Sequence, residues 1–234
     1  AFYHTALETA EFVADSTLKK IERYAFSYNR SLGKVTLPAS VSELGTYAFY
    51  GSAITELKFE ANSALTTLPA HAFASTKLLS VVLPDGVNYI ADNAFRDCVN
   101  LQSVTFGVAE HLQVRANAFY NTAISSLELP ANLEYIGEYA FIGLENLTEY
   151  KADENNPNYR TTDGVLYSKD GKKLIAFPAG KTGNFTVPKT VETIGYGAFE
   201  NTKLASVEFE EGINLLTMGY RAFYNARNLT SVSV

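Results

Sequence analysis

The sequence predicts a repeat solenoid, a right-handed β-solenoid-like stack of short coils with one parallel strand in each coil and turns or short helices as returns. Three observations predict it: an Ala-Phe pair that recurs along the chain, apolar residues that keep the same spacing from each pair, and a short alternating segment after each pair. A β-hairpin inserted near the middle of the second half completes the expected fold.

The Ala-Phe pair sets the period of the repeat. The spacings between pairs are 24, 23, 24, 22, 24, 22, 58 and 24 residues, with pairs that begin at Ala1, Ala25, Ala48, Ala72, Ala94, Ala118, Ala140, Ala198 and Ala222. A period of 20–29 residues with regular leucines is the range of leucine-rich repeats. We therefore expect a single leucine-rich repeat domain over residues 1–234, with about nine to ten coils of 22–24 residues.

Each coil contains the same sequence elements. An apolar couple three residues apart precedes the pair, as in Val41/Leu44, and an L-x-x-V-x-L segment follows it, as in Leu32/Val35/Leu37. The alternation of the last three positions predicts a short strand with one buried face. A proline often follows directly and ends the strand because it lacks the next donor, at Pro38, Pro84, Pro130 and Pro188.

The phenylalanine of each pair is expected to fill the space between coils, while the alanine is small enough for backbones to approach closely. A single coil cannot bury its own apolar stripe, so each coil depends on its neighbours. Burial of one phenylalanine contributes roughly 1.5–3 kcal/mol. The predicted structural core is therefore Phe2, Phe26, Phe49, Phe73, Phe95, Phe119, Phe141, Phe199 and Phe223.

The long spacing of 58 residues marks an interruption, which we assign to an inserted hairpin segment over residues 152–185. Residues 165–167 and 174–177 have the composition of short strands. Asp170-Gly171 lies between them and favours a type I′ turn, and Asn156-Pro157-Asn158 is a turn signal. The hairpin is expected to protrude from the stack or to continue it.

Two stretches, "LPASVSELGTYAFYGSAITEL" and "LPANLEYIGEYAFIGLENLTEY", carry a resemblance to a known family. They resemble the BspA-like leucine-rich repeats, whose pattern is L-P-x-x-V-x-x-I-G-x-x-A-F-x-x-C-x-x-L, and the likeness covers almost the whole chain. It implies a secreted or cell-surface bacterial protein. It also implies adhesion to host proteins such as fibronectin, or coaggregation with other microbes.

The composition of the chain limits the classes of partner that we expect it to bind. The formal net charge is −6 and no run of Lys and Arg offsets it, so we expect no nucleic-acid partner. No apolar run reaches the ~20 residues that span a bilayer, so we expect no membrane insertion in this segment. The single cysteine, Cys98, excludes an internal disulfide and occupies a repeat position that suits a small buried residue.

The sequence predicts no catalytic, cofactor-binding or metal-ligating residues. His4, His71 and His111 fall at unrelated offsets, without the spacing of a zinc site. Asp153 and Glu154 lie in a stretch that lacks the ligand order of a calcium loop and fits a solvated turn. We therefore expect a protein that is not an enzyme.

The candidate binding surface is a set of tyrosines beside the Ala-Phe pairs: Tyr3, Tyr50, Tyr120 and Tyr224 after the phenylalanine, and Tyr24, Tyr47 and Tyr139 before the alanine. Tyrosine is favoured at binding hot spots. The alternative is that these rings pack between coils. The outward strand positions, such as Lys34, Glu56 and Lys58, are polar and include no aromatic residue.

Both ends fall in mid-repeat, so we expect the natural polypeptide to continue. The first hypothesis is a non-enzymatic module, extracellular or at the cell surface, that binds proteins of the host extracellular matrix or of other microbes. The second is a glycan-binding or coaggregation module. The third is a repeat domain of a larger multidomain surface protein.

Overall fold

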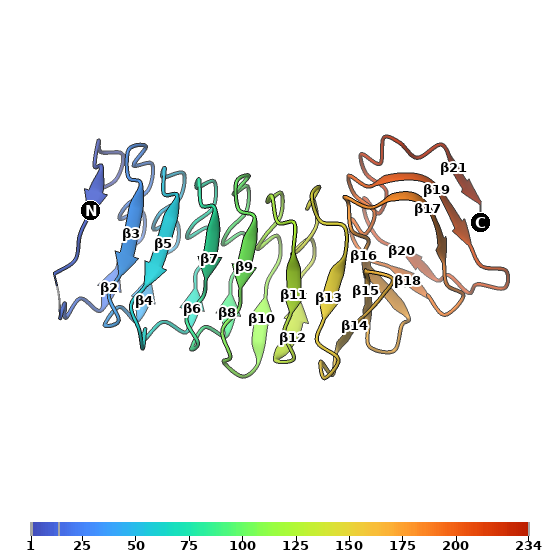
Figure 1. The fold of residues 1–234 in the computed structure, drawn as a ribbon, viewed down its shortest axis with the longest axis horizontal. Helices are drawn as coiled ribbons and strands as arrows, with labels where there is room; N and C mark the ends of the chain where they lie inside the picture. Colours follow the sequence, from blue (N-terminus) through green and yellow to red (C-terminus); the bar gives the residue numbers. More distant parts are fainter. Residues whose placement is uncertain (1, 14, 234) are drawn as a thin grey trace. The chain divides into compact units, whose positions relative to one another are not determined.

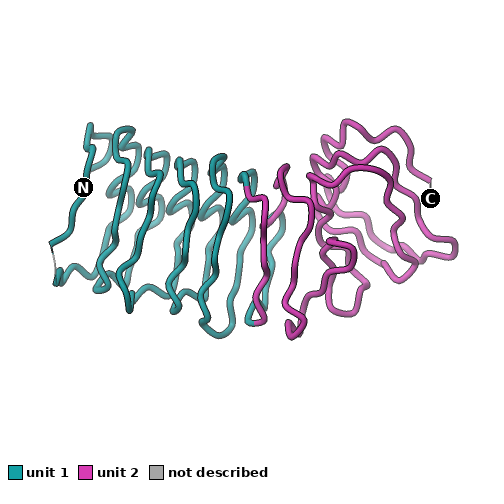
Figure 2. The backbone as a smooth tube through the Cα atoms, in the orientation of Figure 1, with its two compact units in different colours: residues 1–123, 132–140 teal, residues 124–131, 141–234 magenta. Residues whose placement is uncertain are grey.

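The protein is described by a computed structural model that covers residues 2–13 and 15–233. Ala1, the first residue of the first Ala-Phe pair, lies outside the described residues. The chain forms two compact units, unit 1 with residues 1–123 and 132–140 and unit 2 with residues 124–131 and 141–234 (Figure 2). The described residues contain no helix, so the returns of the coils are turns.

The main strands of unit 1 run parallel to one another, side by side in coil order (Figure 1). They are β1 (Thr9–Ala10), β3 (Lys34–Leu37), β5 (Glu56–Phe59), β7 (Ser80–Val82) and β9 (Ser103–Thr105). β3 alternates between exposed and buried side chains, as the sequence predicts, and Val35 pairs in register with Leu57. Pro38 follows β3 directly, where the strand ends.

Each coil of unit 1 also contains a second short strand, which the sequence does not predict. The members are β2 (Lys20–Ile21), β4 (Glu43–Leu44), β6 (Thr67–Leu68), β8 (Tyr89–Ile90), β10 (Leu112–Val114) and β12 (Leu133–Ile136). β6, β8, β10 and β12 form one four-stranded parallel sheet. These strands include the second residue of the apolar couple. Most are two residues long, too short for an alternating pattern to reveal them.

Unit 2 has the same two kinds of strand, arranged in three sheets. The first sheet pairs β11 (Leu127–Leu129) with β13 (Tyr150–Ala152). The second consists of β17 (Thr182–Val187), β19 (Lys203–Phe209) and β21 (Ser231–Ser233). The third consists of β14 (Tyr159–Thr162), β15 (Val165–Ser168), β16 (Lys173–Ala176), β18 (Thr193–Ile194) and β20 (Thr217–Met218). The pairings are parallel except those of β15 with β14 and with β16, which are antiparallel.

The hairpin of β15 and β16 continues the stack, because β16 pairs in parallel with β18. β14 adds a third antiparallel strand. The type I′ prediction for the turn is wrong: Gly171 has a positive φ of 76°, whereas Asp170 does not, and type I′ requires both. The Gly171 N–H donates to Ser168 O at 2.8 Å, and the Asp170 carboxylate accepts from the Lys172 N–H.

β16 leads into a further Ala-Phe pair, Ala176-Phe177, that the sequence-based prediction assigns only to a hairpin strand. The Phe177 N–H donates to Ala198 O at 2.7 Å, and the ring of Phe177 stacks on Phe199 with 5.4 Å between ring centroids. Phe177 therefore takes the same place in its coil as the other phenylalanines. The 58-residue interval contains this additional repeat pair.

The phenylalanines form stacked columns within each unit. Phe26, Phe49, Phe73, Phe95 and Phe119 stack in unit 1 at successive centroid distances of 5.1, 5.4, 5.4 and 5.1 Å. Seven of the nine predicted core rings are buried: Phe26, Phe49, Phe73, Phe95, Phe119, Phe141 and Phe199. Phe2 differs, because half of its surface is exposed, and Phe223 is only partly buried.

Most returns contain two backbone positions in the left-handed region; the return at Ala176-Phe177 is an exception. The residue before the alanine has a positive φ at Tyr24, Tyr47, His71, Asn93, Asn117, Tyr139, Gly197 and Arg221. So does the second residue after the phenylalanine, at His4, Tyr28, Gly51, Ser75, Asp97, Asn121, Gly143, Asn201 and Asn225. Glycine, asparagine, aspartate and histidine are enriched in this region, as several coils here illustrate.

Cys98 is fully buried, as the sequence predicts. Its thiol lies 3.1 Å from Phe73 O and 3.2 Å from the Thr76 hydroxyl. Thr76, Thr122 and Thr202 occupy the same repeat position, and each donates its hydroxyl to the carbonyl of the phenylalanine three residues before it. Burial raises the pKa of the Cys98 thiol to about 11. The cysteine is thus one member of a buried polar column.

Candidate binding surface

A hollow of about 490 Å³ in unit 1 is lined by five tyrosines, which we call the tyrosine patch: Tyr3, Tyr24, Tyr28, Tyr47 and Tyr50. They come from the returns of the first three Ala-Phe coils. Because successive returns are joined by backbone hydrogen bonds, such as Tyr28 N–H to Tyr50 O at 2.8 Å, their side chains emerge beside one another.

Two members of the patch begin a face-to-face stack that runs from coil to coil and continues to His71, beside the patch. Tyr24 stacks on Tyr47 with ring centroids 5.0 Å apart, and Tyr47 stacks on His71 at 4.5 Å. All three side chains occupy the position before the alanine. Because the ring faces cover one another, this row presents ring edges and polar atoms outward.

The other tyrosines stand nearly perpendicular to their neighbours. Tyr3 meets Tyr28 at 5.9 Å and 90°, Tyr28 meets Tyr50 at 5.3 Å and 83°, and Tyr50 meets Tyr47 at 5.4 Å and 73°. Gly51 leaves room for this packing, since a Cβ on it would lie 3.0 Å from the ring of Tyr28. The patch is therefore a rigid, closely packed surface of phenol rings.

Three tyrosines of the patch have a left-handed backbone. Tyr24, Tyr28 and Tyr47 have φ values of 57°, 58° and 60°. A non-glycine residue in this region costs on the order of 1–3 kcal/mol, and strain of this kind clusters at functional sites. Asn93 and Asn117 occupy the same repeat position as Tyr24 with a side chain that tolerates the left-handed backbone. The turn itself therefore does not require tyrosine.

Arg23 lies at the edge of the tyrosine patch. Its guanidinium carbon is 4.7 Å from the ring centroid of Tyr24 and 5.8 Å from that of Tyr47, and its Nη2 donates to the Tyr24 hydroxyl at 3.0 Å.

Two side chains at the patch have shifted pKa values. Burial raises the pKa of Tyr28, assisted by its contact with Tyr50, while the charge of Arg30 opposes that shift. Burial, assisted by the charge of Arg96 and opposed by that of Asp92, lowers the pKa of His71 and so favours the neutral ring.

The structure brings together four of the seven tyrosines that the sequence selects, namely Tyr3, Tyr24, Tyr47 and Tyr50. Tyr120 and Tyr139 contact one another in later coils of unit 1, 6.3 Å apart, and Tyr224 belongs to unit 2, where Arg221 lies 3.9 Å from its ring. Sequence reasoning missed Tyr28 and His71. Both occupy left-handed positions beside an Ala-Phe pair, and that offset is the signal that identifies them.

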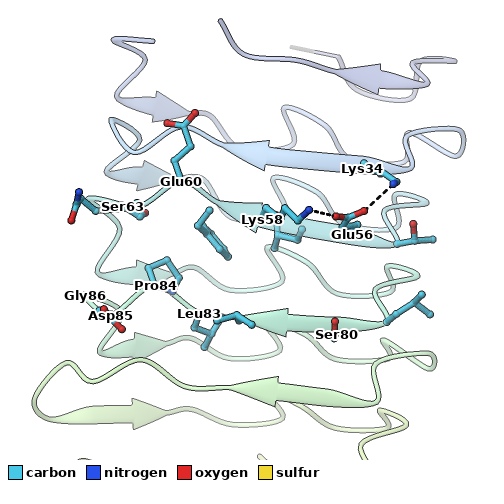
Figure 3. A pocket seen from close by; sticks show the side chains of 17 residues that line it. Lys34, Glu56, Lys58, Glu60, Ser63, Ser80, Leu83, Pro84, Asp85 and Gly86 are labelled. Atoms are coloured by element: carbon cyan, nitrogen blue, oxygen red, sulfur yellow. Dashed lines mark ion pairs between the residues drawn. The ribbon is translucent and has the colours of Figure 1, made fainter. Parts of the chain in front are cut away.

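A second, larger hollow of about 860 Å³ lies on the strand face of unit 1 and extends past β3, β5 and β7 (Figure 3). Glu56 holds two lysines there, with Lys34 Nζ at 3.0 Å and Lys58 Nζ at 2.5 Å (Figure 3). These contacts, that of Lys58 first, lower the pKa of the Glu56 carboxyl. Because these charges satisfy one another and are exposed, the hollow lacks a dominant charge to select a ligand.

The three histidines lie in different surroundings. His4 contacts the rings of Tyr3 and Tyr28, His71 stacks on Tyr47, and His111 pairs with Glu134, which raises the pKa of His111.

The turn that contains Asp153 and Glu154 is held by a neighbouring amide. The buried side chain of Asn156 donates to Pro130 O at 2.8 Å and accepts from the Asn158 N–H at 2.9 Å. The amide group of Asn156 therefore organises this turn.

A model of the BspA type leucine rich repeat region matches in six copies over residues 1–113, 112–162 and 175–234. The chain belongs to the BspA-type leucine-rich repeat family. This identification explains the recurring L-P, I-G and A-F positions as one family pattern. Among curated proteins, none matches the sequence. The described part of the chain contains no helix long and apolar enough to cross a bilayer.

Solved structures of bacterial leucine-rich repeat proteins resemble this BspA-type chain. The pneumococcal vaccine antigen PcpA is 27% identical with a TM-score of 0.87, over 97% of this chain and 60% of that one. A leucine-rich cell-surface protein of Faecalibacterium prausnitzii is 24% identical with a TM-score of 0.72, over 97% of this chain and 68% of that one. A leucine-rich repeat protein of Eubacterium ventriosum is 23% identical with a TM-score of 0.61, over 92% of this chain and 53% of that one. The chain thus spans 60% of the pneumococcal protein, and the last two likenesses concern the fold alone.

Proposed function

We propose that this chain is a non-enzymatic recognition module, extracellular or at the cell surface, that binds protein partners through the tyrosine patch. The observation that carries this proposal is the convergence of five tyrosines from three coils around one hollow. Three of them, Tyr24, Tyr28 and Tyr47, lie at left-handed positions where other coils have asparagine, serine, aspartate, glycine, histidine, arginine or, at Tyr139, tyrosine. Tyrosine supplies a large, rigid and amphipathic contact area at a low cost in side-chain entropy. A partner that docks on the patch benefits from rings that are already fixed by stacking.

The family and its structural neighbours support the location. The chain belongs to a BspA-type family, and the Faecalibacterium prausnitzii protein, which shares its fold, is described as a cell-surface protein. The pneumococcal protein, at 27% identity, is described as a vaccine antigen. Repeat solenoids commonly bind partners along extended surfaces. We infer host extracellular-matrix proteins or surface proteins of other microbes as the partner class.

The surroundings of the reactive side chains support a binding role over a catalytic one. The thiol of Cys98 is buried and its pKa is raised to about 11, which disfavours the nucleophilic thiolate. His71 is stacked on Tyr47, and Glu56 is held between two lysines. Each of these groups has a packing or pairing role in the fold.

The proposal is tested by screening the protein against immobilised matrix and microbial surface proteins, with a glycan array in parallel. The variant Tyr24→Asn/Tyr47→Asn removes two rings and introduces the residue that Asn93 and Asn117 provide at the same repeat position. Tyr139→Asn is the matched control outside the patch. Binding to a protein that the double variant loses and the control retains supports the proposal. Binding to glycans alone, or unchanged protein binding by the double variant, would overturn it.

A further inference from the structure

We propose that the ligand of the tyrosine patch is a proline-rich protein segment in the polyproline II conformation, lying along the row formed by Tyr24, Tyr47 and His71. This inference rests on the proposed protein-binding function and specifies the chemistry of the partner. Polyproline II segments commonly dock in grooves lined with aromatic residues. The five side chains that line this hollow are all tyrosines.

The repeat of the row matches the repeat of such a segment. The ring-to-ring steps from Tyr24 to Tyr47 and from Tyr47 to His71 are 5.0 and 4.5 Å. A polyproline II helix rises ~3.1 Å per residue with three residues per turn, or about 9.3 Å per turn. Two coil steps therefore span about one turn of the ligand. Two ligand residues that are three apart in sequence would then lie at the two ends of the row, one at Tyr24 and one at His71.

The polar atoms of the patch suit the backbone of that ligand. A polyproline II helix makes no internal hydrogen bonds, so its carbonyl oxygens remain as acceptors. The Tyr24 hydroxyl accepts from Arg23 Nη2 at 3.0 Å, which leaves its own proton to donate. Because the faces of Tyr24 and Tyr47 cover each other, their edges and hydroxyls are the parts directed outward. The hydroxyls are thus placed to donate hydrogen bonds to carbonyl oxygens of the ligand backbone.

The charge around the patch also favours this ligand over a cationic one. An alkylammonium ligand would need an open ring face. The guanidinium of Arg23 already lies 4.7 Å from the Tyr24 ring and 5.8 Å from the Tyr47 ring, and the charge of Arg30 reaches Tyr28. A partner that complements this arrangement has uncharged prolines against the outward edges of the phenol rings and acidic residues beside the two arginines.

The test uses the whole chain labelled with 3-fluorotyrosine and observed by fluorine NMR. The probes are a decaproline peptide with two aspartates at each end, the same peptide with alternating glycine and serine in place of proline, and tetramethylammonium chloride. Resonances of the fifteen tyrosines are assigned by single Tyr→Phe variants. We expect the proline peptide to shift the signals of Tyr24, Tyr28, Tyr47 and Tyr50 and to leave that of Tyr139 in place.

The Tyr24→Asn/Tyr47→Asn variant should weaken binding of the proline peptide about tenfold or more, and Tyr139→Asn should leave it unchanged. Equal shifts with the glycine-serine peptide, or shifts with tetramethylammonium but not with the proline peptide, would overturn the inference. If the proline peptide fails while a protein from the screen still loses binding in the double variant, the inference is refuted and the proposed function stands. If the double variant binds every protein as well as the wild type does, both are refuted.

Discussion

The backbone N–H of Phe49 donates to the carbonyl of Ala72, one coil further along, at 2.8 Å. The same bond recurs at Phe26 to Ala48, Phe73 to Ala94 and Phe95 to Ala118. The Ala-Phe motif therefore links coils twice, once through this hydrogen bond and once through the stacked rings. A larger residue in place of the buried alanine would separate backbones that must approach closely.

Phe119 provides a direct test of the ring column. It is fully buried, stacks on Phe95 at 5.1 Å and meets Phe106 edge-on at 6.0 Å. We expect Phe119→Ala to lower the free energy of unfolding by ~3–5 kcal/mol, measured by urea denaturation. Phe2→Ala, at an exposed ring, should cost roughly 1 kcal/mol or less. Equal effects of the two variants would contradict a buried column.

Gly137 tests the close approach of the second strands. A Cβ at this position would lie 2.5 Å from the backbone nitrogen of Ala116, so Gly137→Ala must displace the backbone. We expect destabilisation of ~1–3 kcal/mol in the same denaturation experiment. Gly33→Ala is the control, because a Cβ there meets nothing within 4 Å. Gly33→Ala should be neutral or slightly stabilising. A larger decrease in the free energy of unfolding for Gly33→Ala than for Gly137→Ala would contradict the close approach of the backbones at Gly137.

Replacement of Tyr47 by asparagine separates a functional role for the ring from a packing role. The change relieves the left-handed backbone at φ 60° but removes the stacking with Tyr24 and His71, each contact being worth ~0.5–1.5 kcal/mol. These effects offset each other, so we expect a thermal midpoint close to that of the wild type. A decrease of about 3 kcal/mol or more in the free energy of unfolding would favour the alternative that the tyrosines are needed to pack the coils.

The thiol of Cys98 should react slowly in the native protein. Its pKa is raised to about 11, whereas the thiol of the unfolded chain ionises near 8.5. The buried thiol therefore stabilises the fold only while it is protonated. Its contribution to the free energy of unfolding is fully present below the pKa of the unfolded chain and is lost as the pH rises from about 9 towards 11. We expect Ellman's reagent at pH 8 to label the unfolded chain at least a hundredfold faster than the native chain. Comparable rates would show that the thiol is accessible.

Cys98→Thr should preserve the fold, because Thr76 and Thr122 fill the equivalent position in neighbouring coils. Its hydroxyl would donate to a nearby phenylalanine carbonyl, as theirs do. We expect circular dichroism and the unfolding midpoint to stay close to those of the wild type. A collapse of the midpoint would mean that the cysteine position differs from the rest of the column.

The sequence predicts the features that repeat and misses those that depend on local geometry. The spacing of Phe49, Phe73 and Phe95 is enough to identify the coils and their core, because identical units bury identical side chains. The short strand at Glu43–Leu44 gives no alternating pattern, and its pairing depends on the neighbouring coil. The turn at Gly171 depends on which of two residues adopts a positive φ, a choice that the Asp-Gly pair alone does not determine.

The candidate surface was predictable only in part. Tyr24 and Tyr47 share one offset from the Ala-Phe pair, so a column of rings follows from the sequence. Tyr28 has a different offset and reaches that column only through Tyr50, which it meets edge-on and which in turn meets Tyr47. His71 has the same offset as Tyr24 and Tyr47 but is a different residue type, and it stacks on Tyr47. The conformation of the return therefore determines the composition of the patch.

The most direct measurement of the central claim is the binding affinity and the unfolding midpoint of Tyr24→Asn/Tyr47→Asn, determined on the same sample. The account predicts a midpoint close to that of the wild type together with binding to its protein partner that is at least about tenfold weaker. Unchanged binding in a fully folded double variant would contradict the claim that the tyrosine patch is the recognition surface.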